Sequence, residues 1–172
     1  NDGRLWITYN GEIYNFKEIK KQLSDLGYKF YSKTDTEVIL NAYKHWGIES
    51  FQRFNGMWSF AILDIKEKKL IISRDRYGVK PCYYYNDNEK FIFSSEIKGI
   101  YSSDTIIDLD KNKLTYQQKK LEGAFTTIFH NLDIVPPGSY FLIDLKNYNI
   151  HKKRWWKGLD NLPSINNNLK NI

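Results

Sequence analysis

The hydrophobic pattern of this chain changes its period near residue 55, and this change limits the fold more than any other feature. Before it, apolar residues recur at helical spacing over residues 16–26 and again over 38–46. After it, apolar residues alternate or form short runs typical of strands, over residues 57–65, 69–75, 82–85 and 90–95. Helices that precede a series of consecutive strands indicate an α+β fold rather than alternating α/β units.

Several of these strands carry apolar residues on both faces, as in "FAIL" and "FIF". Such strands suit a sheet that is covered on both sides, or two stacked sheets with helices outside. A further strand is predicted over residues 4–9, and another follows the Pro-Pro-Gly of residues 136–138. Residues 104–135 give no clear pattern.

Local signals predict where the first helices begin and end. Asn15 and Glu18 have the spacing of a capping box, and Gly27 suits the end of the first helix. A short strand is predicted over residues 28–31. The second helix is expected to begin at residue 34 or at Asp35.

Composition places the chain among ordinary globular domains. Its 172 residues fit one domain with a sizeable core. The net charge of +6 is spread among acids and asparagines, so a solvated surface is favoured over a nucleic-acid site. No apolar run is long enough to span a bilayer, so no membrane is expected as a partner. The single cysteine, Cys82, fits a reducing, cytoplasmic location.

The candidate site residues are Asn10, Gly11, Glu12 and Asp35. Glycine lets the backbone approach a ligand closely, and an Asn amide with the next backbone N–H makes a pair of donors for an oxyanion. Asp35, at a helix start, can cap that helix or bind an ammonium group. On spacing alone, a tight turn and a helix cap explain the same residues and are favoured.

Six stretches, in order, resemble the glutaminase domain of glutamine-hydrolysing asparagine synthetase: "YNGEIYN", "SKTDTEVIL", "FNGMWSFAILD", "SRDRYGVKPCYYY", "FSSEIKGI" and "VPPGSYFLID". That domain is a class II glutamine amidotransferase, one of the N-terminal-nucleophile hydrolases. The resemblance runs from about Arg4 to Trp156. It implies the four-layer α/β/β/α sandwich of those enzymes with the first segment missing. It also implies an amidotransferase domain over residues 1–157 and a linker or disordered tail over 158–172.

The resemblance assigns a role to each candidate residue. Asn10 and Gly11 would supply the side-chain and backbone donors of the oxyanion hole. Glu12 would line the glutamine pocket, and Asp35 would bind the α-amino group. The implied reaction hydrolyses L-glutamine, and the ammonia passes to a synthetase domain of the same full-length chain that activates aspartate. No cofactor is expected in this chain, whereas ATP and Mg²⁺ are expected in the synthetase domain; a homodimer is an open alternative.

The chain departs from the family at its start. The family nucleophile is a cysteine at the mature N-terminus, several dozen residues before the NGE motif, and its α-amino group is the base. Here residue 1 is Asn, and the arginine that clamps the glutamine carboxylate has no match. We therefore expect an incomplete domain that is inactive alone. Two alternatives stay open: a non-catalytic amidotransferase-like domain with a regulatory or assembly role, and the glutaminase domain of another amidotransferase.

Three further features are expected to be structural. Cys82 falls where the family has an apolar residue, so a buried thiol is predicted. The charged stretch "SRDRYGVKP" predicts a strand end and turn held by ion pairs, with a phosphate or domain-interface contact as the alternative. His45, His130 and His151 lack metal-ligand spacing, so no metal site is expected.

Overall fold

The computed structural model describes residues 3–87, 89–103, 105–114 and 125–158. The strands in this part are β1 (Leu5–Ile13), β2 (Gly56–Asp64), β3 (Lys69–Arg74), β4 (Tyr83–Asn86), β5 (Phe91–Ser94), β6 (Leu132–Ile134), β7 (Ser139–Asp144) and β8 (Ile150–Arg154). The helices are α1 (Phe16–Asp25), α2 (Asp35–Trp46), α3 (Ser50–Arg53) and α4 (Ile97–Tyr101), with a 3₁₀ turn at Gly47–Glu49.

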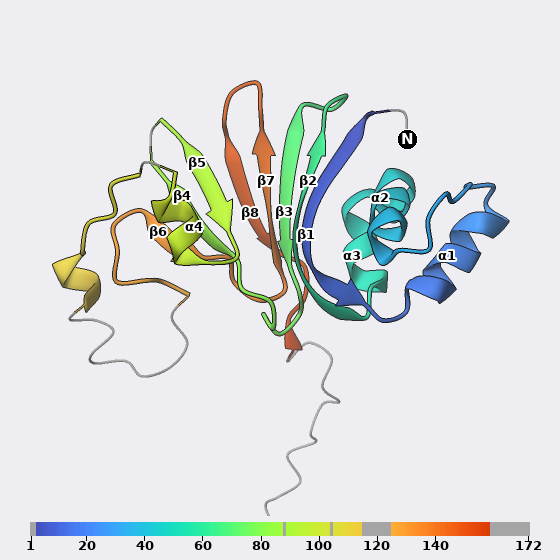
Figure 1. The fold of residues 1–172 in the computed structure, drawn as a ribbon, viewed down its shortest axis with the longest axis horizontal. Coiled ribbons are helices and arrows are strands. Elements are labelled where there is room, and N and C mark those ends of the chain that lie inside the picture. Colours follow the sequence, from blue (N-terminus) through green and yellow to red (C-terminus); the bar gives the residue numbers. More distant parts are fainter. Residues whose placement is uncertain (1–2, 88, 104, 115–124, 159–172) are drawn as a thin grey trace, which may run out of the picture.

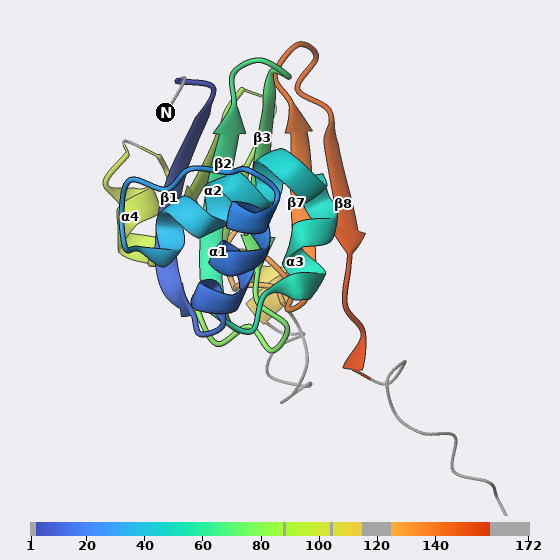
Figure 2. The ribbon, with the colours of Figure 1, turned by 90° about the vertical axis from the view of Figure 1, so that its right-hand side faces the viewer.

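Two antiparallel sheets stack between helices (Figure 1). The larger sheet has the strand order β1-β2-β3-β7-β8, and the smaller has the order β5-β4-β6. Helices α1, α2 and α3 cover the outer face of the larger sheet (Figure 2), and α4 lies with the smaller sheet on the opposite side. The predicted α+β fold with α/β/β/α layers is therefore confirmed.

Strands β2 and β3 contribute to the core on both of their faces. Trp58, Phe60 and Ile71 are buried against the helices. Ala61 and Ile72 are buried on the opposite face, towards the smaller sheet. Because side chains alternate along a strand, a strand that is apolar on both faces needs cover on both sides. The stacked sheets provide that cover, as "FAIL" predicted.

The helix layer follows the predicted spacing, with one difference at the start of α1. Helix α2 begins at Asp35, and Gly27, with a φ of +90°, follows the end of α1. The predicted capping box is wrong, because Asn15 makes no side-chain bond to its own helix. Instead, the Asn15 amide donates to the Arg53 carbonyl (2.9 Å), and its oxygen accepts from the Asn55 N–H (2.8 Å). Asn15 therefore ties the start of α1 to the loop before β2.

Two short segments differ from the sequence-based expectation. Residues 28–31 are not a strand. The Glu37 carboxylate accepts the backbone N–H groups of Tyr31 (2.8 Å) and Ser32 (2.7 Å), so a side chain takes the place of a neighbouring strand. Strand β6, which lies in the stretch without a clear pattern, pairs with β4. Its three residues are too few for a recognisable alternation.

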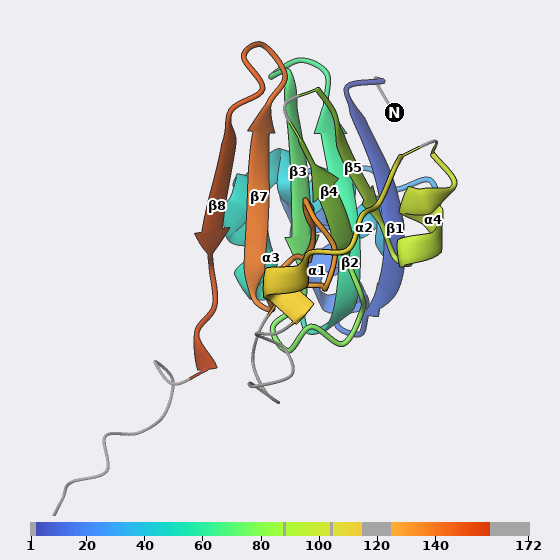
Figure 3. The same ribbon diagram turned by 90° about the vertical axis from the view of Figure 1, so that its left-hand side faces the viewer.

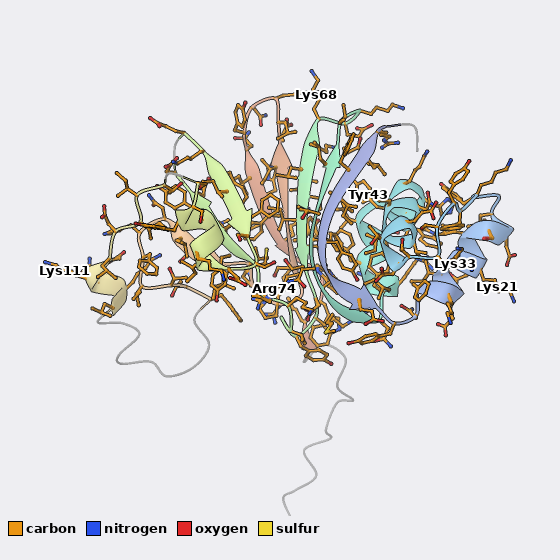
Figure 4. All side chains as sticks on the ribbon, viewed as in Figure 1. Lys21, Lys33, Tyr43, Lys68, Arg74 and Lys111 are labelled. Atoms are coloured by element: carbon orange, nitrogen blue, oxygen red, sulfur yellow. The ribbon has the colours of Figure 1, made fainter. Side chains whose placement is uncertain are left out.

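The stretch "SRDRYGVKP" forms the turn after β3, at the end of the sheet where Arg74 lies (Figure 4). Carbonyl oxygens of Gly78, Lys80 and Val135 accept hydrogen bonds of 2.7 Å from the Arg74 guanidinium. Asp75 is buried and accepts backbone N–H groups from Trp58, Tyr77, Val79 and Lys80. The expectation of ion pairs is wrong, because backbone groups rather than opposite charges hold both side chains. The stretch is a structural anchor.

Within the described ranges, no helix combines the length and apolar character needed to cross a membrane. The tail expected over residues 158–172 lies outside the described residues, apart from Gly158. The domain boundary at residue 157 therefore stays a prediction.

Candidate active site

In the described part of the chain, strand β1 forms one edge of the larger sheet. At its two ends, the Ile65 N–H donates to the Arg4 carbonyl (3.0 Å), and the Tyr14 N–H donates to the Asn55 carbonyl (2.7 Å). Even-numbered residues therefore turn their backbone groups towards β2, and odd-numbered residues turn theirs towards the open edge. The Gly11 N–H consequently points to the open edge.

Asn10 and Gly11 lie inside β1, opposite Ser59 and Trp58 of β2, so the tight-turn interpretation is wrong. A Cβ at Gly11 would lie 2.2 Å from the Met57 carbonyl oxygen and 2.7 Å from the Trp58 Cα. Only glycine fits at these distances. The missing side chain lets β1 and β2 approach closely and leaves the Gly11 N–H accessible from the edge.

The Asn10 side chain points from β1 towards the smaller sheet. Its Nδ2 donates to the Ser95 Oγ at 3.1 Å, and this bond joins the two sheets. A hollow of about 590 Å³ lies beside it, lined by Thr8–Asn10, Ser59–Ala61 and Phe93–Glu96. Figure 3 shows β5 and α4 over this side of β1. An amide nitrogen carries two N–H groups, so one remains for a ligand in the hollow.

Asp35, the first residue of α2, is held against the same edge of β1. Its Oδ2 accepts the Tyr9 hydroxyl (2.8 Å) and the Ile13 N–H (3.0 Å). The carboxylate therefore contacts β1 and does not cap its own helix. Burial, and then the hydrogen bond to Asp35, raise the pKa of Tyr9, so its hydroxyl stays a donor.

Gly11 and Asp35 thus meet on one short stretch of edge, and Asn10 adjoins Gly11 with its side chain on the opposite face of β1. The N–H groups of Gly11 and Ile13 face the same side, and the rise of two residues along the strand places them roughly 7 Å apart. Donors near Gly11 and the carboxylate of Asp35 can bind an anionic oxygen and a cation at opposite ends of one ligand. Glu12 is exposed, and its side chain lies on the same face of β1 as that of Asn10.

Sequence reasoning did not find Tyr9 or Ser95. Strand alternation places Tyr9 on the helix side of β1 with Ile13, and this signal alone could have directed it towards α2. Ser95 is 85 residues away from Asn10, so no spacing rule connects them.

Cys82 lies outside this group. It is 1% exposed, and burial raises its pKa although a hydrogen bond with Ser59 acts in the opposite direction. The prediction of a buried thiol is therefore confirmed. His45 packs edge-on against Tyr28 and Trp46. Among the described residues, no three His, Cys, Asp or Glu side chains come close enough together to hold a metal ion.

Comparison with known families gives a match over nearly the whole chain. The model of the glutamine amidotransferase domain matches residues 1–156. A Methanocaldococcus jannaschii relative, named as a putative glutamine-hydrolysing asparagine synthetase 2, is 38% identical over 162 residues, which are 91% of this chain and 31% of that protein. Glutamine-hydrolysing asparagine synthetase 1 of Bacillus subtilis is 36% identical over 143 residues, with 83% and 23% covered. The chain spans less than a third of either relative.

The solved structures include glutamine phosphoribosylpyrophosphate amidotransferase from Bacillus subtilis, complexed with ADP and GMP. The match has a TM-score of 0.66 and 20% identity, and covers 91% of this chain and 30% of that chain. At this identity the similarity concerns the fold alone. It agrees with the two stacked sheets and their outer helices.

Proposed function

The chain belongs to the glutamine amidotransferase family, and we propose that residues 1–157 are the glutamine-hydrolysing domain of a longer asparagine synthetase. This domain would release ammonia from the side-chain amide of L-glutamine. A synthetase domain would use the ammonia, with ATP and Mg²⁺, to convert aspartate to asparagine. The observation that carries the proposal is the open edge of β1, where the outward-facing Gly11 N–H lies two positions before the Ile13 N–H that binds the Asp35 carboxylate.

The size of glutamine fits this interval. Four bonds separate its amide carbon from its α-nitrogen, so an extended molecule spans about 5 Å between them. With hydrogen bonds of about 3 Å at each end, it can reach from the Gly11 N–H to Asp35.

Each residue has a defined role in the proposed reaction. Asn10 and Gly11 would bind the oxyanion of the tetrahedral intermediate, and Asp35 would bind the α-ammonium group. Glu12 would line the pocket from the Asn10 face. Cys82 is 1% exposed, and burial raises its pKa, so we assign it no part in the reaction, and the nucleophile and its base would come from sequence outside residues 1–172. The lone thiol also supports a cytoplasmic location, where it would stay reduced.

The test is an Asn10→Ala substitution in the full-length protein. Removing one oxyanion donor is expected to lower kcat for glutamate release by about 10²- to 10³-fold. Asparagine synthesis supplied with free ammonium should persist, because it bypasses glutamine hydrolysis. Asn41→Ala, on the half-buried surface of α2, is the matched control and should leave both activities unchanged.

Three results would count against the proposal in different ways. Unchanged glutamate release by the Asn10→Ala protein would contradict the oxyanion role. A folded wild-type protein that releases no glutamate from glutamine would favour the non-catalytic, regulatory alternative. Glutamate release that is coupled to an acceptor other than aspartate would favour another amidotransferase.

A further inference from the structure

We propose that Tyr9 is a positioning residue that holds the Asp35 carboxylate for the α-ammonium group of glutamine, and thereby sets the preference for amides that carry this group. The inference rests on the proposed function and deepens it. It begins from the contact between the Tyr9 hydroxyl and the Asp35 Oδ2.

The contact fixes which carboxylate oxygen is free. Oδ2 already accepts two hydrogen bonds, from the Tyr9 hydroxyl (2.8 Å) and the Ile13 N–H (3.0 Å). Among the described residues, nothing donates to Oδ1 of Asp35. A tyrosine hydroxyl can only donate to an ionised carboxylate. The pair therefore holds Oδ2 against β1 and leaves Oδ1 to accept from a cationic group.

The tyrosine itself is held firmly. Its ring packs edge-on against Phe60, with 6.5 Å between ring centroids, and it belongs to the core between β1 and the helices. The donor is therefore presented from a packed strand rather than from a loop. Without the hydroxyl, only the Ile13 N–H would restrain the carboxylate, which could then rotate away from the ligand.

The position of Tyr9 in the strand links the two ends of the site. Tyr9 directly precedes Asn10 and Gly11, so one strand carries both the proposed oxyanion donors and the anchor of the carboxylate. The distance between the bound oxygen and the bound ammonium then depends on β1 itself. A substrate without an α-amino group gains nothing from the anchored carboxylate. The tyrosine should therefore affect glutamine and leave such a substrate unaffected.

The experiment compares two substrates in the full-length protein with a Tyr9→Phe substitution. For glutamine, we expect KM to rise about 3- to 10-fold with kcat within about twofold, because the hydrogen bond acts on ground-state binding. For glutaramate, the same amide without the α-amino group, KM should not change. Tyr140→Phe is the matched control, since Tyr140 is half-buried in the same core and packs on Phe51 without contacting Asp35.

A double substitution separates this inference from the proposed function. Asp35→Asn should raise KM for glutamine, and adding Tyr9→Phe to it should cause no further rise. If Asp35→Asn raises KM and Tyr9→Phe does not, the positioning role is wrong while the proposed function stands. Equal losses for glutamine and glutaramate would mean a general structural defect and would also overturn the role. If the wild-type protein releases no glutamate, both the function and the inference fail.

Discussion

Replacing Asp75 by asparagine tests how the turn after β3 supports the strand pair that carries the proposed site. The buried Asp75 carboxylate accepts the N–H groups of Trp58 (3.2 Å) and Lys80 (3.0 Å) at Oδ2, and two more backbone N–H groups at Oδ1. Trp58 is the β2 residue that pairs with Gly11. Asp75 therefore anchors the strand against which β1 lies. Asparagine keeps one acceptor oxygen but turns an NH₂ group towards two N–H donors.

The magnitude follows from the number of bonds lost. Hydrogen bonds to a charged group contribute about 1.5–3 kcal/mol each, and two of them are removed at a buried position. We therefore expect the free energy of unfolding to fall by about 4 kcal/mol. With a urea m-value of about 2 kcal/mol/M for a domain of this size, the unfolding midpoint should fall by about 2 M.

Urea unfolding followed by tryptophan fluorescence measures this shift, because Trp58 lies beside the substituted residue. Asp87→Asn is the matched control. Asp87 also accepts two backbone N–H groups, from Glu89 and Lys90, but in an exposed hairpin where water can replace it. A midpoint shift below about 0.5 M for Asp75→Asn at an unchanged m-value, or an equal shift in the control, would refute the reasoning.

Two further substitutions test the packing of β1 and the charge at its start. Gly11→Ala should lower the free energy of unfolding by about 1–3 kcal/mol, because its Cβ would lie 2.2 Å from the Met57 carbonyl oxygen; an unchanged urea midpoint would contradict this. Burial, the largest single effect, would raise the pKa of Asp64, but the hydrogen bond and charge of Arg4 and the backbone N–H groups of Lys66 and Glu67 together outweigh it and hold the pKa below its usual value. This pair therefore stabilises the fold above pH of about 4 and loses that contribution as the pH falls further. Asp64→Asn should flatten the acid side of a plot of thermal midpoint against pH, and an equally steep slope would disprove the assignment.

The parts of the fold that follow from local pattern could be predicted from the sequence. Periodicity alone identified the apolar stripe of α2 and the strands β2 and β3, which are apolar on both faces, because each lies within one continuous stretch of sequence. The apolar residues on both faces of these strands also predicted that a second layer must cover the larger sheet. Packing of Ala61 and Ile72 on the side of the smaller sheet satisfies that requirement.

The parts that failed depend on partners distant in the sequence. Asn10-Gly11 has the composition of a tight turn, but pairing with Ser59 and Trp58 keeps it extended. Asn15 has the spacing of a cap, but the loop at Asn55 competes for its side chain. In each case a tertiary hydrogen bond overrode a local preference, and no pattern within ten residues could reveal it.

The proposed site likewise combines residues that a local motif locates with one that only tertiary contacts bring into place. Asn10 and Gly11 are neighbours on one strand, so a short motif was enough to locate them. Asp35 reaches them only because α2 packs on the larger sheet and the Tyr9 hydroxyl and Ile13 N–H bind its carboxylate. Since β1 holds every one of these groups, the spacing between the proposed oxyanion donors and the carboxylate depends on a paired strand and not on a mobile loop. A strand changes its length far less than a loop does, so a site carried by β1 would keep its donors and the bound carboxylate at a fixed spacing.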